Sequence, residues 1–260
     1  MTRIARVCVR SGWCMAGLLA WLAIASSAGA QTTEAPAIAP IEVLTCNFAE
    51  GKGPTDIDAL ARGFNQWMER THAPEYAAYT LTPLSHSDEI DFDLAWVGAW
   101  PDGLTMGQSM AHYFAEGAEL GPLFNDVMKC GTNRNFSVVT LREPIDGGRF
   151  GPLEVSTCTL RVGAAMNDAL QAVRQWVDYA GTTGSTAAQW LLFPAYGERS
   201  DANYNFKWAV GYASYEAFGR EYDQATNGDG LDHYNSLIGG LLRCDSPRLY
   251  AVRPIRLPQK

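Results

Sequence analysis

Two kinds of hydrophobic pattern alternate along this chain. Residues 41–48 (IEVLTCNF) are rich in β-branched side chains and alternate between apolar and polar positions, which predicts a strand. In residues 55–70 the apolar side chains recur every three or four positions, which predicts an amphipathic helix. A broken helical stretch leads up to Cys130. The same reasoning places further strands at about residues 76–83, 91–100 and 136–142.

The resulting order of elements is β-α-β-β-α-β, the ferredoxin-like arrangement, and the chain contains it twice. The motif Glu-Val-x-Thr-Cys occurs in residues 41–48 and again in residues 153–160. DFDLAWVGAW at residues 91–100 is matched by NYNFKWAVGY at residues 203–212. Further matches keep the same order, with an offset between 109 and 114 residues. Such self-similarity indicates a tandem duplication.

These matches define the domain organisation. We predict two ferredoxin-like repeats, residues 41–145 and 153–258, joined by a linker at 146–152 and preceded by a flexible leader at 31–40. One such unit has helices on one face of its sheet only, so its other face needs a cover. Two copies can bury each other's open faces, either face to face or as one barrel. We therefore predict an α+β fold in which two tandem βαββαβ repeats pack as a pseudo-symmetric α/β barrel.

The first 30 residues have the pattern of a cleaved secretory signal. Three arginines precede an apolar run, and Ala28-Gly29-Ala30 supplies the small residues that favour cleavage after Ala30. An uncleaved anchor is the alternative. No later segment approaches the roughly 20 apolar residues that a spanning helix needs. We expect a periplasmic or secreted protein with no membrane span in its mature form.

Removal of that segment makes the chain more acidic. It takes three arginines and no acids, leaving 17 basic against 28 acidic residues, a net charge of −11. Nucleic-acid binding depends on lysine and arginine neutralising phosphates, so we expect no nucleic-acid partner. The two repeats together predict a monomer with an internal pseudo-dimer.

The four cysteines of the mature chain predict disulfides. An even number in an exported protein allows three connectivities. The first and last strands of a ferredoxin-like sheet are neighbours, which favours Cys46–Cys130 and Cys158–Cys244. A four-thiolate metal site is the alternative, but no C-x-x-C motif supports it, so we expect no metal site.

The motifs TCNF, EIDFDLAWVGAWPDG and VMKC, within tandem βαββαβ repeats, resemble an uncharacterised family of exported bacterial proteins. Its fold is similar to that of the dimeric α/β-barrel superfamily, and the resemblance covers the whole mature chain. That superfamily includes cofactor-free monooxygenases, haem-degrading and haem-peroxidase proteins, isomerases, and proteins without known activity. The resemblance implies a fold and a compartment, because fold alone does not decide chemistry.

Charged residues differ between the two copies of the Trp-containing strand. Asp91 and Asp93 share a strand face with Ala95, and the matching row of the second repeat is Asn203, Asn205 and Lys207. If the rows line a common cavity, two carboxylates face an ammonium, which suits acid–base catalysis by Asp91, Asp93 and Lys207. The alternative is a solvated edge of the barrel, where the exchange of Asp for Asn is harmless.

Aromatic residues offer a second candidate site. Six of them occupy matching strand positions and could line a flat apolar pocket or simply fill the core. They are Tyr79, Trp96, Trp100, Trp190, Trp208 and Tyr212.

The histidines show no metal spacing, but one axial histidine is enough for a haem, so His86 and His112 stay open. NGDGLDH (227–233) lacks the spacing of a calcium loop and is predicted to be a turn. We predict no cofactor.

The sequence supports three hypotheses about function. The first is a protein that binds a small apolar or aromatic organic molecule in a cavity between the repeats. The second is a cofactor-independent acid–base enzyme, monooxygenase- or isomerase-like, that uses Asp91 and Asp93. The third is an envelope protein that acts through its surface and has no cavity.

Overall fold

The first strand, β1 (Ile38–Phe48), contains the alternating stretch that predicted it and begins at Ile38 rather than at residue 41. The structure is a computed structural model that describes residues 38–145, 147–149 and 151–258. The predicted signal segment and the leader up to residue 37 lie outside the described residues. Within the described ranges, no helix is long and apolar enough to cross a bilayer.

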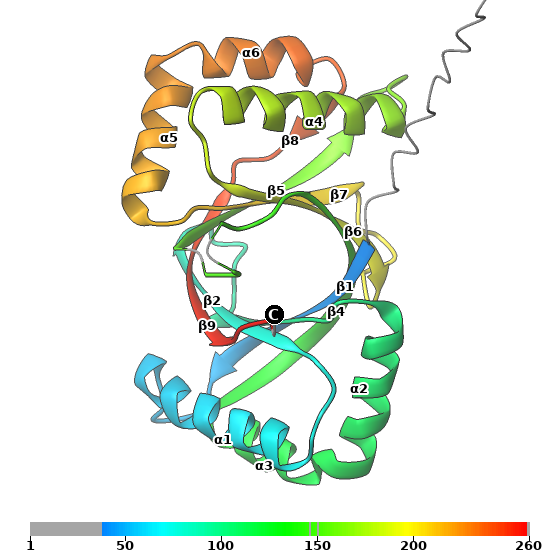
Figure 1. Cartoon of the computed structure of the whole chain (residues 1–260), viewed down its shortest axis with the longest axis vertical. Helices are drawn as coiled ribbons and strands as arrows, with labels where there is room; N and C mark the ends of the chain where they lie inside the picture. Colours follow the sequence, from blue (N-terminus) through cyan, green and yellow to red (C-terminus); the bar gives the residue numbers. More distant parts are fainter. Residues whose placement is uncertain (1–37, 146, 150, 259–260) are drawn as a thin grey trace, which may run out of the picture. The chain divides into compact units, whose positions relative to one another are not determined.

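Each half of the chain follows the predicted order of elements (Figure 1). The first half consists of β1, a 3-10 turn (Pro54–Asp56), α1 (Ile57–Arg70), β2 (Ala77–Ser85), β3 (Leu94–Ala99), α2 (Gly103–Glu116), a 3-10 turn (Gly117–Glu119), α3 (Leu120–Val127) and β4 (Met128–Arg142). The second half consists of β5 (Pro152–Leu160), α4 (Met166–Thr182), β6 (Ala188–Tyr196), β7 (Phe206–Gly211), α5 (Tyr215–Asn227), α6 (Gly230–Leu237), β8 (Leu242–Cys244) and β9 (Arg248–Arg256).

The strands form one closed antiparallel barrel. Its order is β5-β7-β6-β4-β1-β3-β2-β9, and β9 pairs back with β5, while β8 pairs with β5 beside the ring. The two halves meet through two strand pairs, β4 with β6 and β2 with β9. Closure leaves no free sheet edge in the ring. The fold is the predicted pseudo-symmetric α/β barrel, and the barrel arrangement replaces the face-to-face alternative.

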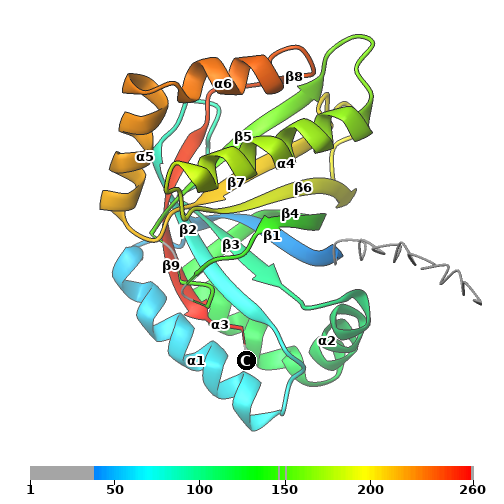
Figure 2. The same cartoon turned by 45° about the horizontal axis from the view of Figure 1, so that its top comes forward.

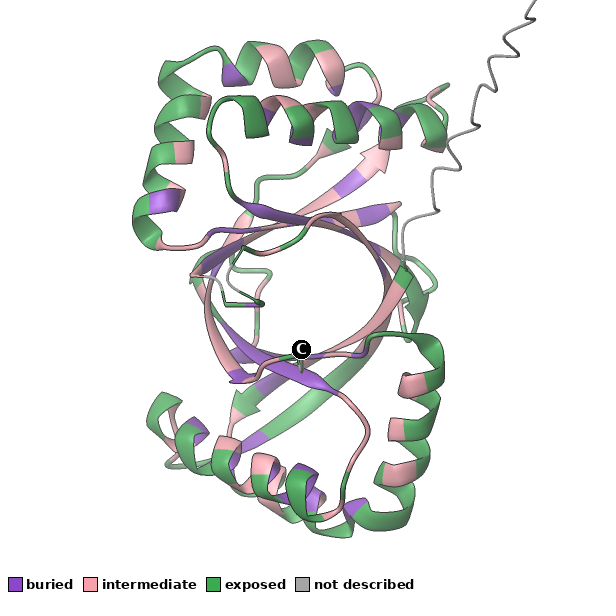
Figure 3. Ribbon diagram, viewed as in Figure 1, coloured by how far each residue is buried: buried purple, intermediate pink, exposed green. Residues whose placement is uncertain are grey.

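Side chains alternate between two layers along each strand. Inward-facing residues fill the barrel interior, among them Leu81, Phe136, Leu192 and Tyr250. Outward-facing residues pack under the helices in two separate cores, and the last strand of the other half adds Ile255 to the first core and Leu141 to the second. Figure 3 shows many of the exposed residues on the outer sides of the helices, with a further exposed stretch at the start of β4. Both faces of most strands are therefore covered.

The helix α1 shows how the sequence pattern becomes a core. Its apolar stripe, predicted from the spacing, is buried against the outer face of the first-half strands; the buried members are Ile57, Leu60, Phe64, Trp67 and Met68. Figure 2 shows α1, α2 and α3 on the side of the first-half strands that faces away from the second half.

Both predicted disulfides are present. Cys46 pairs with Cys130 across β1 and β4, and Cys158 pairs with Cys244 across β5 and β8. The bridged cysteines are 84 and 86 residues apart along the chain. On the loop-entropy model, each bridge contributes roughly 4–5 kcal/mol by restricting the unfolded chain.

The last strand differs between the halves. In the first half β4 is continuous from Met128, longer than the predicted 136–142, and only Gly131 separates the cysteine from the next paired residue. In the second half Asp245, Ser246 and Pro247 separate β8 from β9. Proline has no N–H for the ladder, so the strand breaks there. The Asp245 side chain takes over one ladder position by accepting from the Thr157 N–H at 2.6 Å.

Candidate functional site

A cavity of about 500 Å³ lies between the outer face of the first-half strands and the helices α1, α2 and α3. Its walls are mainly aromatic, and its polar lining includes Glu42, Ser109, His112 and Asn133. The expected location between the repeats is not where this cavity lies, because side chains of both halves fill the barrel interior. The aromatic wall consists of Phe64, Trp67, Tyr76, Trp96, Trp100, Tyr113, Phe114 and Phe124.

A glycine on β3 makes room for the aromatic ring at the centre of this wall. Tyr76 lies just before β2, and a Cβ at position 98 would overlap its hydroxyl group and ring. Gly98 therefore lets the Tyr76 ring lie flat against β3. In the second half the matching residues are Val210 and Ala187, so the small and large residues have exchanged places.

Tyr76 is the middle of a hydrogen-bond chain. The Trp96 indole Nε1 donates to the Tyr76 hydroxyl at 2.9 Å, and that hydroxyl donates to Glu42 Oε1 at 2.7 Å. On the other side of the carboxylate, Asn133 Nδ2 lies 3.5 Å from Oε2. Because Glu42 has an even position on β1, it points outward into the helix-covered layer with Leu44.

The carboxyl group of Glu42 has an altered affinity for protons. Burial raises its pKa above the ordinary value, while the hydrogen bonds from Tyr76 and Asn133 oppose this effect. Burial, followed by the charge of Glu42, raises the pKa of Tyr76 well above its ordinary value. Glu42 is thus the group in this cavity that is suited to exchange a proton at a pH above that of an exposed glutamate.

The second half pairs the matching glutamate with a different tyrosine. Glu154, 112 residues after Glu42, accepts from the Tyr212 hydroxyl at 2.8 Å, and Tyr212 holds the position of Trp100. Burial raises the pKa of Glu154, with a smaller contribution from the charge of Glu221. Here the indole of Trp208 donates to Gln189 at 3.1 Å instead of to a tyrosine.

These two glutamates were not among the site residues predicted from the sequence. Both belong to the repeated motif Glu-Val-x-Thr-Cys, and that repetition was the available signal.

Asp93 and Asn205 accept equivalent hydrogen bonds from backbone N–H groups in the two halves. Asp93 Oδ2 accepts from the Phe48 N–H at 2.9 Å, and Asn205 Oδ1 accepts from the Leu160 N–H at 2.7 Å. A neutral amide oxygen serves this position as well as a carboxylate does, which accounts for the exchange of Asp for Asn. Asp91 is exposed. Since β3 begins only at Leu94, Asp91 and Asp93 do not continue a strand face with Ala95, contrary to the prediction.

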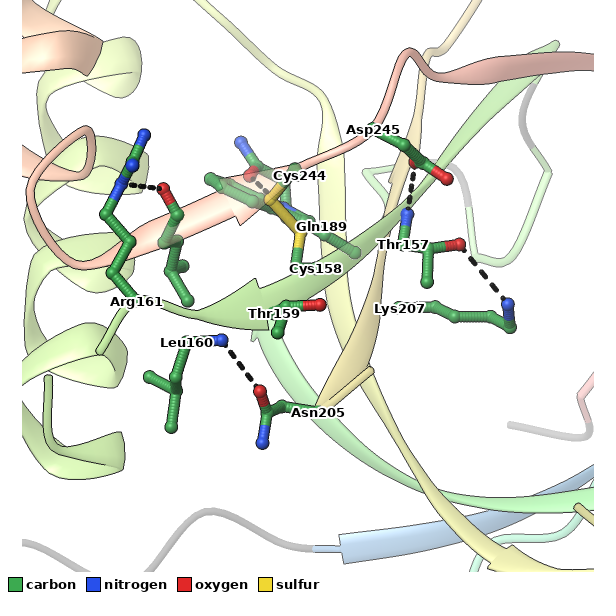
Figure 4. Close-up of a disulfide and its surroundings, with 12 residues drawn as sticks. Thr157, Cys158, Thr159, Leu160, Arg161, Gln189, Asn205, Lys207, Cys244 and Asp245 are labelled. Carbon is green, nitrogen blue, oxygen red and sulfur yellow. Dashed lines mark hydrogen bonds between the residues drawn. A yellow bond between two sulfur atoms is a disulfide. The ribbon is translucent and has the colours of Figure 1, made fainter. Parts of the chain in front are cut away.

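Lys207 lies on the other side of the barrel from Asp93. It belongs to β7, which is separated from β3 by β6, β4 and β1 in one direction and by β5, β9 and β2 in the other. Its ammonium group lies 3.4 Å from the Thr157 hydroxyl (Figure 4). A catalytic role for Asp91, Asp93 and Lys207 stays a prediction.

The six candidate aromatic residues are distributed over several environments. Trp96 and Trp100 line the cavity. Trp208 packs in the second-half core and Tyr212 in a small cluster with Ala187 and Ala217. Trp190 packs against the barrel interior, and Tyr79 is buried on β2.

The residues around the cavity do not fit a haem. His112 is the histidine that lines it, and its Nε2 lies 2.8 Å from the Thr71 hydroxyl while its ring packs on Trp67. Among the described residues that line the cavity none is lysine or arginine, so the propionates of a haem would have no cationic partner. His86 lies in an exposed stretch that follows β2. The predicted turn at 227–233 is shorter in the structure, because only Gly228 and Asp229 connect α5 to α6 and residues 230–233 already belong to α6. Within the described ranges no group of three metal-binding side chains occurs.

Comparison with known proteins shows a shared fold. No protein-family model matches the chain, and no curated protein matches its sequence. A protein from Fusobacterium nucleatum subsp. nucleatum described as a "putative monooxygenase" is similar in structure, with a TM-score of 0.53 and 8% identity over 86% of this chain and 95% of that one.

Two further solved structures are similar to a lower degree. One is a "putative monooxygenase" from Lactobacillus acidophilus, with a TM-score of 0.47 and 15% identity over 87% of this chain and 97% of that one. The other is described as a novel heme-binding protein from Thermus thermophilus, with a TM-score of 0.46 and 8% identity over 84% of this chain and 95% of that one. At 8% identity the likeness to the Fusobacterium nucleatum protein concerns the fold alone, an α/β barrel as predicted from the sequence.

Proposed function

We propose that this dimeric α/β-barrel protein binds a small, flat, apolar or aromatic organic molecule in the cavity of its first half. The observation that carries the proposal is an aromatic lining that contains, among the described residues, a single carboxylate, that of Glu42. A largely apolar cavity of a few hundred Å³ with a few convergent polar groups is typical of small-molecule sites.

The aromatic wall favours a flat ligand. Trp96 contacts Phe124 and Phe64 edge-on, with ring centroids 4.8 and 5.3 Å apart. Tyr76 meets Trp100 in the same manner at 5.2 Å. Rings held at such angles present both faces and edges to the cavity. A planar molecule can stack on the faces and make edge-to-face contacts with the edges.

Two buried donors can orient a polar atom of the ligand. Trp100 Nε1 and Ser109 Oγ are buried and have no hydrogen-bond partner among the described residues. Both residues line the cavity. Buried polar groups of native proteins are nearly always hydrogen-bonded, so a ligand acceptor between them would complete the site.

A second function, acid–base catalysis without a cofactor, is favoured by the raised pKa of Glu42. A buried carboxyl group whose pKa is raised holds its proton more tightly than an exposed glutamate does, and it can transfer that proton to or from a bound molecule. Under this second hypothesis Glu42 is the catalytic group, Tyr76 and Asn133 position it, and the apolar wall excludes water. Glu42 then has the catalytic role that was predicted from the sequence for Asp91 and Asp93.

Binding can be tested by filling the cavity from α2, a helix none of whose residues is buried. Ser109→Phe places a ring in the cavity, and Gln108→Phe adds the same ring at an exposed neighbouring position. The probe is N-phenyl-1-naphthylamine, an uncharged aromatic dye whose fluorescence rises in apolar surroundings. We expect saturable fluorescence with the native protein and Gln108→Phe, and at least a tenfold weaker affinity with Ser109→Phe.

Two outcomes would contradict the proposal. The native protein could fail to bind the dye, which would favour the surface-acting envelope protein. Alternatively, Ser109→Phe could bind as tightly as Gln108→Phe, which would place the dye elsewhere.

We also propose that the protein acts in the periplasm or outside the cell. Its two disulfides support this location, because such bonds persist in oxidising compartments.

A further inference from the structure

Three cationic side chains meet at one end of the barrel. Arg134 on β4 stands opposite Val43, and Arg248 on β9 stands opposite Val155. Since Val43 and Val155 hold matching positions 112 residues apart, the two arginines are matched across the barrel. Lys207 on β7 is the third cation, and in the first half its place is taken by Ala95.

Thr157 links two of these cations. Its hydroxyl lies 2.8 Å from Arg248 Nη2 and 3.4 Å from Lys207 Nζ. In Figure 4 the Lys207 side chain extends from its strand toward this hydroxyl, and Asp245 approaches the backbone of Thr157 from the other side. Lys207 Nζ also lies 4.5 Å from the centre of the Tyr204 ring.

The nearby carboxylates do not balance the three charges. Asp245 pairs with Arg248 at 2.7 Å and accepts from the backbone of Thr157. Glu198 lies 3.4 Å from Arg134 Nε and also accepts from the hydroxyl of Tyr204. Within residues 38–145, 147–149 and 151–258, no carboxylate lies within 4 Å of the Lys207 ammonium. The cluster therefore has three cations and two anions.

This cluster, with its excess of one positive charge, is partly buried. Burial, followed by the charge of Arg248, lowers the pKa of Lys207; Arg134 acts in the same direction, while Glu198 and Asp245 oppose it. Arg134 Nε is buried and lacks a well-aligned hydrogen-bond partner in the described part of the chain. A buried cation without a counter-charge is unfavourable, so an anion bound here would be stabilised.

We propose that this end of the barrel binds a small oxyanion, a carboxylate or phosphate group, between Lys207, Arg134 and Arg248. The ammonium of Lys207 supplies the unbalanced charge, and Arg134 Nε and the Thr157 hydroxyl supply directed donors. The side chains of Arg134 and Arg248 are 30% and 16% exposed, so solutes can reach the cluster. Because Ala95 replaces Lys207 in the first half, the site occurs once. It shares no side chain with the cavity of the first half.

Thermal unfolding of the mature protein in inorganic phosphate tests this proposal. A ligand of the folded state raises the unfolding temperature in a saturable manner. The reference is sodium chloride at equal ionic strength. Lys207→Met removes the unbalanced charge, and Lys129→Met removes a charge from an exposed lysine of β4. Phosphate also stabilises proteins without binding to a site. The proposal is therefore tested by the difference between Lys207→Met and Lys129→Met in the rise of unfolding temperature with phosphate.

We expect a saturable, phosphate-specific rise in unfolding temperature for the native protein and for Lys129→Met. In Lys207→Met the apparent affinity should fall about tenfold or more. If that variant does not fold, Arg134→Gln should show the same fall. A parallel series in sodium acetate separates the two ligand sources, because a saturable rise in acetate alone would identify a carboxylate. Equal unfolding temperatures of the native protein in all three salts would overturn the proposal, and so would an undiminished phosphate effect in the variants.

Discussion

The Tyr76 hydroxyl donates a hydrogen bond of 2.7 Å to the carboxylate of Glu42 and so ties the start of β2 to β1, although β3 lies between these strands. The bond crosses β3 at Gly98, whose missing side chain leaves room for the ring. The same hydroxyl accepts from Trp96, so one hydrogen-bond chain at the wall of the cavity joins β1, β3 and the residue that precedes β2.

The pH dependence of stability should report the pKa of Glu42. Because its pKa is raised in the folded state above the ordinary 4.5, the folded protein binds the proton more tightly than the unfolded chain does. The free energy of unfolding should therefore fall as the pH rises from about 4.5 through the folded-state pKa. In Glu42→Gln this loss should become smaller by the contribution of Glu42, because Glu154 still titrates with a raised pKa, while the exposed control Glu89→Gln should keep the full loss.

Urea unfolding between pH 4 and pH 8 measures this effect. Identical pH profiles of the native protein and Glu42→Gln would show that Glu42 titrates as an exposed glutamate. Glu154→Gln should remove a similar loss in the second half, because burial raises that pKa as well.

Gly98→Ala should destabilise the protein by about 1–3 kcal/mol, because the new Cβ overlaps the Tyr76 ring. In a Tyr76→Ala background the same substitution should cost far less, as the pairing of Ala187 with Val210 in the second half suggests. Chemical denaturation of the two single variants and the double variant gives the coupling energy. Strictly additive effects would mean that Gly98 and Tyr76 do not interact. Gly121→Ala, where a Cβ meets open space, is the control.

Asp93→Asn should leave stability within about 0.5 kcal/mol of the native value, because the amide oxygen can keep the bond to Phe48 that Asn205 makes to Leu160. Asp93→Ala should lose about 0.5–1.5 kcal/mol with that bond. The two variants can be compared by thermal unfolding. A large loss in Asp93→Asn would show that the negative charge is needed, and would return weight to the acid–base hypothesis for Asp91 and Asp93.

Replacing Cys158 and Cys244 together by serine should lower the free energy of unfolding by about 2–5 kcal/mol. Guanidinium unfolding without reductant measures this loss, and the matched replacement of Cys46 and Cys130 should give a similar value because the loops have nearly equal length. A variant as stable as the oxidised native protein would contradict a stabilising role for the bridge.

The architecture could be predicted from the sequence because its signals are local or repeated. The stripe of α1 depends on spacing alone, and the cysteine pairing follows once the first and last strands of each repeat are known to be neighbours. Asp91 and Asp93 were misplaced because DFD continues the alternation of the strand, whereas Asp93 binds the end of β1 before β3 begins.

The candidate site was harder to predict because it depends on contacts between distant segments. In a barrel covered by helices both strand faces are buried, so alternation does not reveal that Glu42 points into a cavity rather than into solvent. Its partner Tyr76 is distant in sequence and reaches it only across β3. Lys207 was likewise predicted to be catalytic, because its neighbours Arg134 and Arg248 are distant in sequence and come together only when the barrel closes.

The most direct test of the central claim is an NMR titration of the indole N–H signals with N-phenyl-1-naphthylamine, each signal being assigned by a Trp→Phe variant. The account predicts that the signals of Trp100 and Trp96, which line the cavity, shift on binding. The signal of Trp208, which donates to Gln189 in the other half, should stay in place. Unmoved Trp96 and Trp100 signals in the presence of saturating dye, or a shift confined to Trp208, would contradict a ligand site in the first half.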